Sequence, residues 1–249
     1  MDLDEQTRQC LQSSGALSAD DWAALQAYRP RSGFVFLPAE EAADMRRYLD
    51  EFLEQYGDLV PILGDGNSNY WCVYVRGALA GMVCHFDHEE EDLAPRYLNV
   101  ARLLAAVERQ PQCHDFYDLL TAARDYDFPL RAPLPMPQRH DVMRQLQQRL
   151  SACEDEVVAK NLAFAIMNLC AADELEAWLY PFLDSEDMWI QERAIELLGL
   201  HRYTPARERL RELQHSAQHN GRLAAERALQ QLAAPLPSTP ENPYEPKKT

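Results

Sequence analysis

The sequence predicts an α+β fold, in which a region with a small sheet comes first and a region of helices alone follows. Three observations indicate this class. Short apolar strands lie between residues 58 and 87, amphipathic helical patterns lie on both sides of them, and a helical pattern repeats after residue 140. We therefore expect a mixed sheet with flanking helices, followed by an all-α solenoid of about three helix pairs.

Three strands are expected in the sheet, over residues 60–63, 70–75 and 82–86. The middle strand has apolar or aromatic side chains on both faces, so we expect it to be central and covered on both sides. The alternation of a strand divides its side chains into two sets, Tyr70, Cys72 and Tyr74 on one face and Trp71, Val73 and Val75 on the other.

Helices are expected on both sides of these strands. Ser18 and Asp21 match a capping box and open a short helix to about residue 28. A longer amphipathic helix is expected over 38–57, with an apolar stripe of Met45, Leu49, Phe52, Leu53 and Tyr56. Further elements are expected over 98–107 and 115–124, with a short edge strand over 34–37.

Prolines mark the boundary between the two regions. Pro129, Pro133, Pro135 and Pro137 crowd a short segment, which predicts an extended, fairly stiff connection with little contact to either side. The tail is rich in proline as well and is expected to be disordered. The expected organisation is a first domain over 1–130, a linker over 131–139, a helical domain over 140–233 and a tail over 234–249.

The helical pattern after residue 140 repeats. Residues 158–166 align with 190–198 at an offset of 32, and 192–198 align with 226–232 at an offset of 34. A period in the low thirties made of helix pairs is typical of solenoids, and the pattern resembles short HEAT-type repeats. The expected pairs are 140–151 with 155–171, 174–183 with 187–201, and 205–216 with 220–233.

The charge of the chain favours a basic or neutral partner. The net charge is −16, of which residues 1–130 contribute −13 and residues 131–249 contribute −3. This charge argues against binding to nucleic acid or to an anionic membrane. No apolar run is long enough to span a bilayer, the N-terminus is acidic and polar, and the cysteines form no CxxC pairs. We therefore expect a reduced, cytoplasmic setting.

The first region contains, in order, the run 61–70, the aromatic strand 71–75, the turn 81–83, an Asp87-His88-Glu89 stop and a following helix 99–104. On these features it resembles the SUKH superfamily over about residues 38–107. The resemblance implies an α+β fold without catalysis. It also implies an immunity protein that binds and neutralises a bacterial polymorphic toxin, often a nuclease, encoded by an adjacent gene. The acidic first half independently suits a protein that caps a basic cleft.

Two groups of residues are the expected partner contacts, one in the sheet region and one in the helical region. An acidic run follows the third strand, and a polar turn precedes the second; the two would reinforce each other if they met at one sheet edge. Such a run is also typical of a solvated loop. In the helical region Trp189 either is an exposed anchor or seals a joint between repeats. The expected contact residues are Asp65, Asn67, Asn69, Asp87, Glu89, Glu90, Glu91, Asp92, Asp184, Glu186, Asp187 and Trp189.

A metal site, a cofactor and catalysis are not expected. His85, Asp87 and His88 invite a metal interpretation, but no distant His or Cys cluster completes four ligands, and His85 is better explained as a packed strand residue. The sequence contains no GxSxG, HExxH, P-loop or GxGxxG motif. The alternative to an immunity protein is a scaffold or adaptor whose helical repeats recruit a protein partner.

Overall fold

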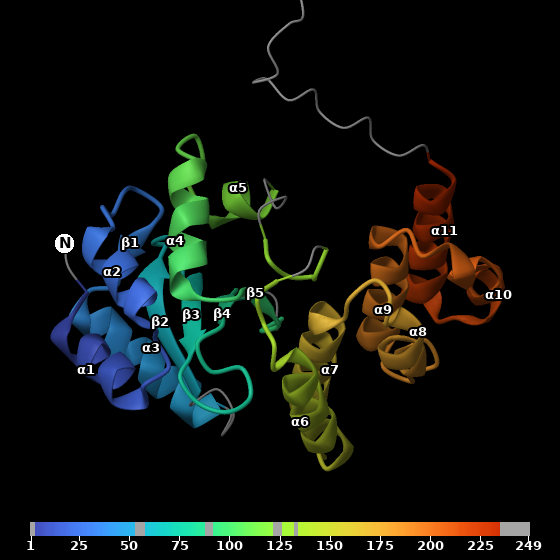
Figure 1. Ribbon diagram of the computed structural model, residues 1–249, viewed down its shortest axis with the longest axis horizontal. Helices are drawn as coiled ribbons and strands as arrows, with labels where there is room; N and C mark the ends of the chain where they lie inside the picture. The colour runs from blue at the N-terminus through green and yellow to red at the C-terminus, as the bar shows by residue number, and fades with distance from the viewer. Residues whose placement is uncertain (1–2, 53–57, 88–91, 122–125, 132–133, 235–249) are drawn as a thin grey trace, which may run out of the picture.

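The computed structural model describes residues 3–52, 58–87, 92–121, 126–131 and 134–234 of the chain. A five-stranded sheet with flanking helices forms the first half, and the second half contains helices without strands among these residues (Figure 1). The predicted α+β class is therefore confirmed. The strands are β1 Val35–Phe36, β2 Leu59–Gly64, β3 Tyr70–Tyr74, β4 Val83–Phe86 and β5 Pro95–Tyr97.

The sheet is antiparallel throughout, so the expected mixed sheet is wrong. The strand order is β1-β2-β3-β4-β5, and each neighbouring pair is antiparallel. The connections explain this, because β2, β3 and β4 follow one another through short turns that leave no room for the crossover that parallel strands require. β3 is central, as predicted. β5 was not predicted, because its three residues are too few for alternation to be recognised.

The two faces of the sheet have separate cores, as the alternation in β3 predicts. Trp71 and Val73 belong to the core beneath α1, α2 and α4, whereas Tyr70 and Cys72 belong to the core beneath α3. Trp71 is fully buried. The flanking helices are α1 Glu5–Ser14, α2 Ala19–Ala27, α3 Ala39–Phe52, α4 Val100–Arg109 and α5 Phe116–Thr121.

Local sequence signals position these helices. Ser18 and Asp21 form the expected capping box of α2, and Asp21 Oδ1 also accepts a hydrogen bond of 2.9 Å from Ala101 N on α4. That second bond fixes α2 against α4. Met45 and Leu49 of the predicted stripe on α3 are buried. Residues 53–57 of the expected 38–57 helix lie outside the described residues.

In the helical half α6 packs on α7 and α10 packs on α11, whereas the expected helix over 174–183 is only the four-residue α8 and a 3-10 turn over Tyr180–Phe182. The inner helices α7, α9 and α11 contact one another in that order. Gly199 of α9 lies so close to α11 that an added Cβ would be 2.8 Å from Ala228 Cα, so no larger side chain fits there. No helix among the described residues is long and apolar enough to cross a membrane. The helices are α6 Arg139–Ser151, α7 Glu156–Leu169, α8 Leu175–Trp178, α9 Met188–Leu200, α10 Arg207–Ser216 and α11 His219–Ala233.

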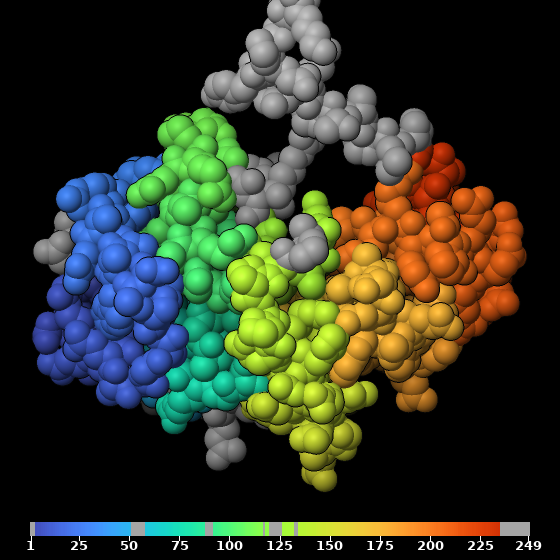
Figure 2. Space-filling view, viewed as in Figure 1, coloured from blue at the N-terminus to red at the C-terminus, as the bar shows by residue number. Residues whose placement is uncertain are grey.

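The two halves share a packed core. The connecting segment was expected to make little contact with either half, and this expectation is wrong. Phe128, Leu130 and Met136, from the proline-rich connecting segment and just before it, are buried. They lie in one apolar cluster with Leu79 and Met82 of the sheet half and with residues of α6 to α11. The proline pattern indicated an extended backbone but could not show what the apolar residues between the prolines contact. Figure 2 shows the two halves in contact on the face in view.

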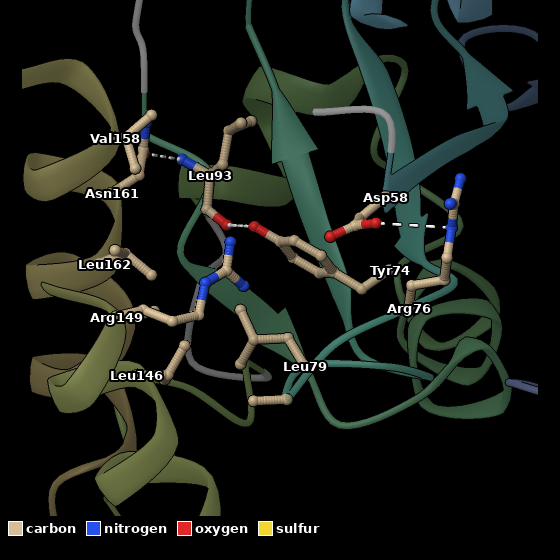
Figure 3. A pocket seen from close by; sticks show the side chains of 12 residues that line it. Asp58, Tyr74, Arg76, Leu79, Leu93, Leu146, Arg149, Val158, Asn161 and Leu162 are labelled. Carbon is tan, nitrogen blue, oxygen red and sulfur yellow. Dashed lines mark hydrogen bonds and ion pairs between the residues drawn. The ribbon is translucent and has the colours of Figure 1, made fainter. Parts of the chain in front are cut away.

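Hydrogen bonds reinforce this joint at the sheet side of α7. Tyr74 Oη donates to Leu93 O at 2.7 Å, and Leu93 N donates to Asn161 Oδ1 of α7 at 2.9 Å (Figure 3). Beside them, Arg149 of α6 extends between Tyr74 and Leu79. The cavity that these residues leave is about 40 Å³, enough for little more than one water molecule. This joint is therefore a packed interface.

Candidate partner-binding surface

Two segments with expected partner contacts leave the sheet at the same end. The turn 65–69 leads into β3, and the sheet register pairs Tyr70, at the start of β3, with Phe86, at the end of β4. Asp87 follows Phe86 directly. The turn and the start of the acidic run therefore meet at one sheet edge, as the sequence suggested. Within the run, Glu89, Glu90 and Glu91 lie outside the described residues.

The turn 65–69 is held by its own side chains. Asp65 Oδ1 accepts hydrogen bonds from Asn67 N at 2.7 Å and Asn69 N at 3.3 Å, and Asp65 Oδ2 accepts from Asn69 Nδ2 at 2.8 Å. Asn69 is fully buried, whereas Asn67 is exposed. Asp65 and Asn69 therefore stabilise the turn, and Asn67 is the most exposed residue of the three.

Next to this turn lies a shallow depression between α3 and the start of β3, with a volume of about 560 Å³. Three carboxylates of the first turns of α3 surround it, and two tyrosines form part of its wall. We call it the acidic-aromatic depression. Its lining residues are Pro38, Glu40, Glu41, Asp44, Met45, Tyr48 and Tyr70.

Aromatic contacts hold the tyrosines of the depression in place. Tyr48 is 44% exposed and packs edge-on against Phe86, with ring centroids 6.2 Å apart. Tyr70 Oη donates to Glu41 Oε1 at 3.1 Å. Burial, and then the Glu41 carboxylate, raise the pKa of Tyr70 to about 12, so the hydroxyl remains a donor at neutral pH. Asp65 of the turn contributes to the same shift, as the smallest of its causes.

The sequence did not single out Glu40, Glu41, Asp44 and Tyr48. Carboxylates in the first turn of a helix are usually explained by the helix dipole and by solvation, so they gave no sign of a site. A signal was present in Tyr48, which lies next to the apolar stripe of α3 and not on it. A large aromatic residue on the polar side of an amphipathic helix suggests a contact beyond the helix's own core.

Asp92, one of the expected contact residues, is buried and not exposed at the surface. Its side chain is 9% exposed, and it forms ion pairs with Arg96 at 2.6 Å and with Arg193 of α9. Burial alone would raise the pKa of Asp92, but Arg96, Arg193 and the N–H of Ala94 together lower it to about 2. The two arginines offset the cost of removing this carboxylate from water.

The second group of expected contacts lies in the helical half, away from the depression (Figure 1). Asp187 is the N-cap of α9 and accepts from Trp189 N at 2.8 Å, and Asp184 pairs with Arg209. Glu186 is exposed, and Trp189 is 52% exposed. Trp189 therefore lies exposed at the surface and does not seal a joint between repeats.

His85 is packed within the sheet half. Its ring lies 5.0 Å from Trp71 and 5.6 Å from Phe116, between ring centroids, and its exposure is 6%. Burial lowers the pKa of His85 to about 4, so the imidazole is neutral at physiological pH. Among the described residues there is no group of three or more His, Cys, Asp or Glu that could hold a metal ion.

Comparison of the chain with protein-family models, with curated proteins and with solved structures found no match. The resemblances to SUKH domains and to HEAT-type repeats therefore rest on the order and spacing of residues in this chain.

Proposed function

We propose that this chain is a protein-binding protein that neutralises a bacterial toxin, with the acidic-aromatic depression as its contact for a basic side chain of that toxin. The observation that carries the proposal is the meeting of Glu40, Glu41 and Asp44 with two tyrosines at the sheet end where Asp87 also emerges. No catalysis is part of this role.

The chemistry of the depression suits a lysine or arginine side chain. Carboxylates attract the cation, and a tyrosine ring offers its negative face to it at close range. Tyr48 is already held against Phe86, so little side-chain freedom is lost when a partner covers it. Tyrosine and arginine are also the residues that most often dominate the free energy of protein–protein association.

The charge of the chain supports a basic partner over a longer range. Residues 1–130 contribute −13 of the net −16, and the depression lies among them. Such a field raises the rate of association with a basic surface, such as the cleft of a nuclease, and repels nucleic acid itself. The resemblance to SUKH domains makes an immunity protein, which caps the toxin's active site, the specific form of this proposal.

The proposal is tested by co-expressing the chain with the product of an adjacent gene. We expect that product to be a toxin that stops growth alone, and that co-expression of this chain restores growth through a one-to-one complex. A variant with Glu40→Gln, Glu41→Gln and Asp44→Asn should restore growth less well at equal expression. A neighbouring product that forms no complex with the chain would refute the immunity role.

A second candidate function is that of an adaptor that recruits its partner through the helical half. The exposed indole of Trp189, beside the exposed Glu186, favours it. The two functions differ in which variant fails. Trp189→Ala should abolish partner binding by an adaptor and leave toxin neutralisation intact, whereas the triple change in the depression should do the reverse.

A further inference from the structure

A second cavity, of about 350 Å³, lies where β5 and the segment 126–131 face α9 and α11. It shares no residue with the acidic-aromatic depression. Tyr126 lines it, and Leu197 and Leu200 give it an apolar wall. In a chain with a net charge of −16 this cavity is lined by four arginines, Arg96, Arg131, Arg193 and Arg227.

Two of these arginines are held in place by one carboxylate. Arg96 and Arg193 both pair with Asp92, whose side chain is 9% exposed. The guanidinium of Arg193 also lies over the ring of Phe164, 4.7 Å from its centroid. Both arginine side chains are therefore held in place without a ligand. The single negative charge of Asp92 pairs with the two positive charges of Arg96 and Arg193.

The other two arginines leave the cavity with a net positive charge. Arg227 pairs with Glu192 at 3.4 Å and Glu196 at 2.9 Å. Arg131 forms no ion pair with any residue that the structure describes. The four guanidinium groups thus face three carboxylates, Asp92, Glu192 and Glu196, and one positive charge remains.

Two buried donors of the lining have no acceptor in the part of the chain that the structure describes. They are Nε of Arg96 and the hydroxyl of Tyr126. Burial raises the pKa of Tyr126, so its hydroxyl keeps its proton and can donate. A buried donor without an acceptor costs about 1–3 kcal/mol. Two such donors border this cavity, and an acceptor that entered it could satisfy them.

We propose that this cavity binds a small organic oxyanion, a phosphate or a carboxylate with an apolar body. The anionic group would accept hydrogen bonds from Arg96 and Tyr126 and pair with Arg131, and the apolar body would lie on Leu197 and Leu200. The volume is within the range of small-molecule sites, which begins at roughly 300 Å³. This site is independent of the function proposed above, because it involves none of the residues of the depression.

Titration calorimetry of the full chain with phenyl phosphate and with inorganic phosphate, at constant ionic strength in chloride, tests the proposal. We expect both to bind, phenyl phosphate more tightly because its ring covers the apolar wall. Arg131→Gln should weaken the binding of phenyl phosphate at least tenfold, and Tyr126→Phe should weaken it about fivefold or more. Arg211→Gln, which removes an exposed arginine of α10 outside the cavity, should leave both affinities unchanged.

Thermal unfolding separates binding from folding in the same variants. Tyr126→Phe removes a buried hydroxyl without a partner, so the unliganded variant should melt at or above the wild-type temperature even though it binds the ligand less well. The proposal is overturned if neither phosphate binds above the chloride background. It is equally overturned if Arg131→Gln and Tyr126→Phe bind phenyl phosphate as the wild type does, because the two donors would then be satisfied by water alone.

Discussion

Asp92 and Arg193, 101 residues apart in the sequence, form an ion pair across the joint between the sheet half and the helical half. Arg96 binds the same carboxylate from the sheet side at 2.6 Å. Because Asp92 is 9% exposed, this triad lies inside the joint and not on its rim. It ties the segment before β5 to α9, so the two halves depend on each other for a charge balance as well as for an apolar core.

The first prediction concerns this triad. Asp92→Asn leaves two guanidinium groups without their shared carboxylate and should lower the free energy of unfolding by about 3–5 kcal/mol, measured by urea denaturation. Asp184→Asn is the matched control, because Asp184 also pairs with an arginine but its side chain is 74% exposed. Its loss should stay below about 1 kcal/mol. Equal losses at the two positions would mean that the triad is solvated.

The second prediction is a dependence of stability on pH that His85 causes. Burial lowers the pKa of His85 from 6.5 to about 4. Between these pH values the unfolded chain therefore binds a proton at His85 that the folded protein does not bind. The stability that His85 contributes is therefore complete above pH 6.5 and is lost as the pH falls towards 4. The loss amounts to at most about 3 kcal/mol.

His85→Leu removes this titration and also a buried ring nitrogen without a partner among the described residues. Compared with the wild type, the variant should lose less stability between pH 6.5 and 4, as measured by urea denaturation at each pH. Below pH 3.8 both proteins should weaken together, because Asp92 of the unfolded chain then binds a proton that folded Asp92, whose pKa is about 2, does not bind. Parallel curves between pH 6.5 and 4 would mean that folded His85 accepts a proton.

The third prediction is that the two halves do not fold well apart. A fragment of residues 138–235 would expose the side of α7 that packs on Leu79, Met82 and Phe128 in the full chain. It should be helical by circular dichroism but should melt broadly and bind a hydrophobic dye. A sharp, cooperative melt of the fragment would instead support independent domains with a boundary near residues 131–139.

The fourth prediction tests the orientation of α3. Leu49 is fully buried between α3 and the sheet, so Leu49→Ala should lower the free energy of unfolding by about 2–5 kcal/mol. Arg47, whose side chain is 65% exposed, should tolerate alanine within about 0.5 kcal/mol. Similar losses would show that the helix is rotated. Phe52, expected on the same stripe, has a side chain outside the described residues.

The elements with strong local signals were predicted from the sequence. The alternation of β3 separated its two faces correctly, and the capping box placed the start of α2. α1 was missed although Asp4 caps it, because its ten residues have a polar composition and few of them are buried. Local sequence patterns therefore predicted local structure. The direction of strand pairing was predicted wrongly, because it also depends on how the strands are connected.

The candidate site was predicted less completely, because it depends on contacts between distant residues. Asp92 looked like its neighbours in the acidic run, and only its position beside Arg193 explains its burial. Glu41 and Tyr70 are 29 residues apart, and their hydrogen bond appears only once α3 lies on the sheet. The meeting of the turn 65–69 with Asp87 could be anticipated, because it follows from the register of adjacent strands.

The last prediction tests whether the acidic-aromatic depression receives the partner. Changing Glu40 and Glu41 to Gln and Asp44 to Asn removes three negative charges but keeps the acceptor for Tyr70. Association with the adjacent gene's product, measured by stopped flow, should slow by about one decade and depend less on salt. Tyr48→Ala should instead raise the dissociation rate, because it removes a desolvated contact and not a steering charge.

The matched control for this last prediction removes the same number of charges from the helical half, through Asp141→Asn, Glu208→Gln and Glu212→Gln, whose side chains are 62%, 78% and 64% exposed. If the depression is the contact, this control slows association far less than the change at Glu40, Glu41 and Asp44, because steering depends on charges near the contact. Equal slowing by both triple changes, with no effect of Tyr48→Ala, would mean that only net charge attracts the partner. The binding surface would then have to lie elsewhere, and the exposed Trp189 would be the next position to change.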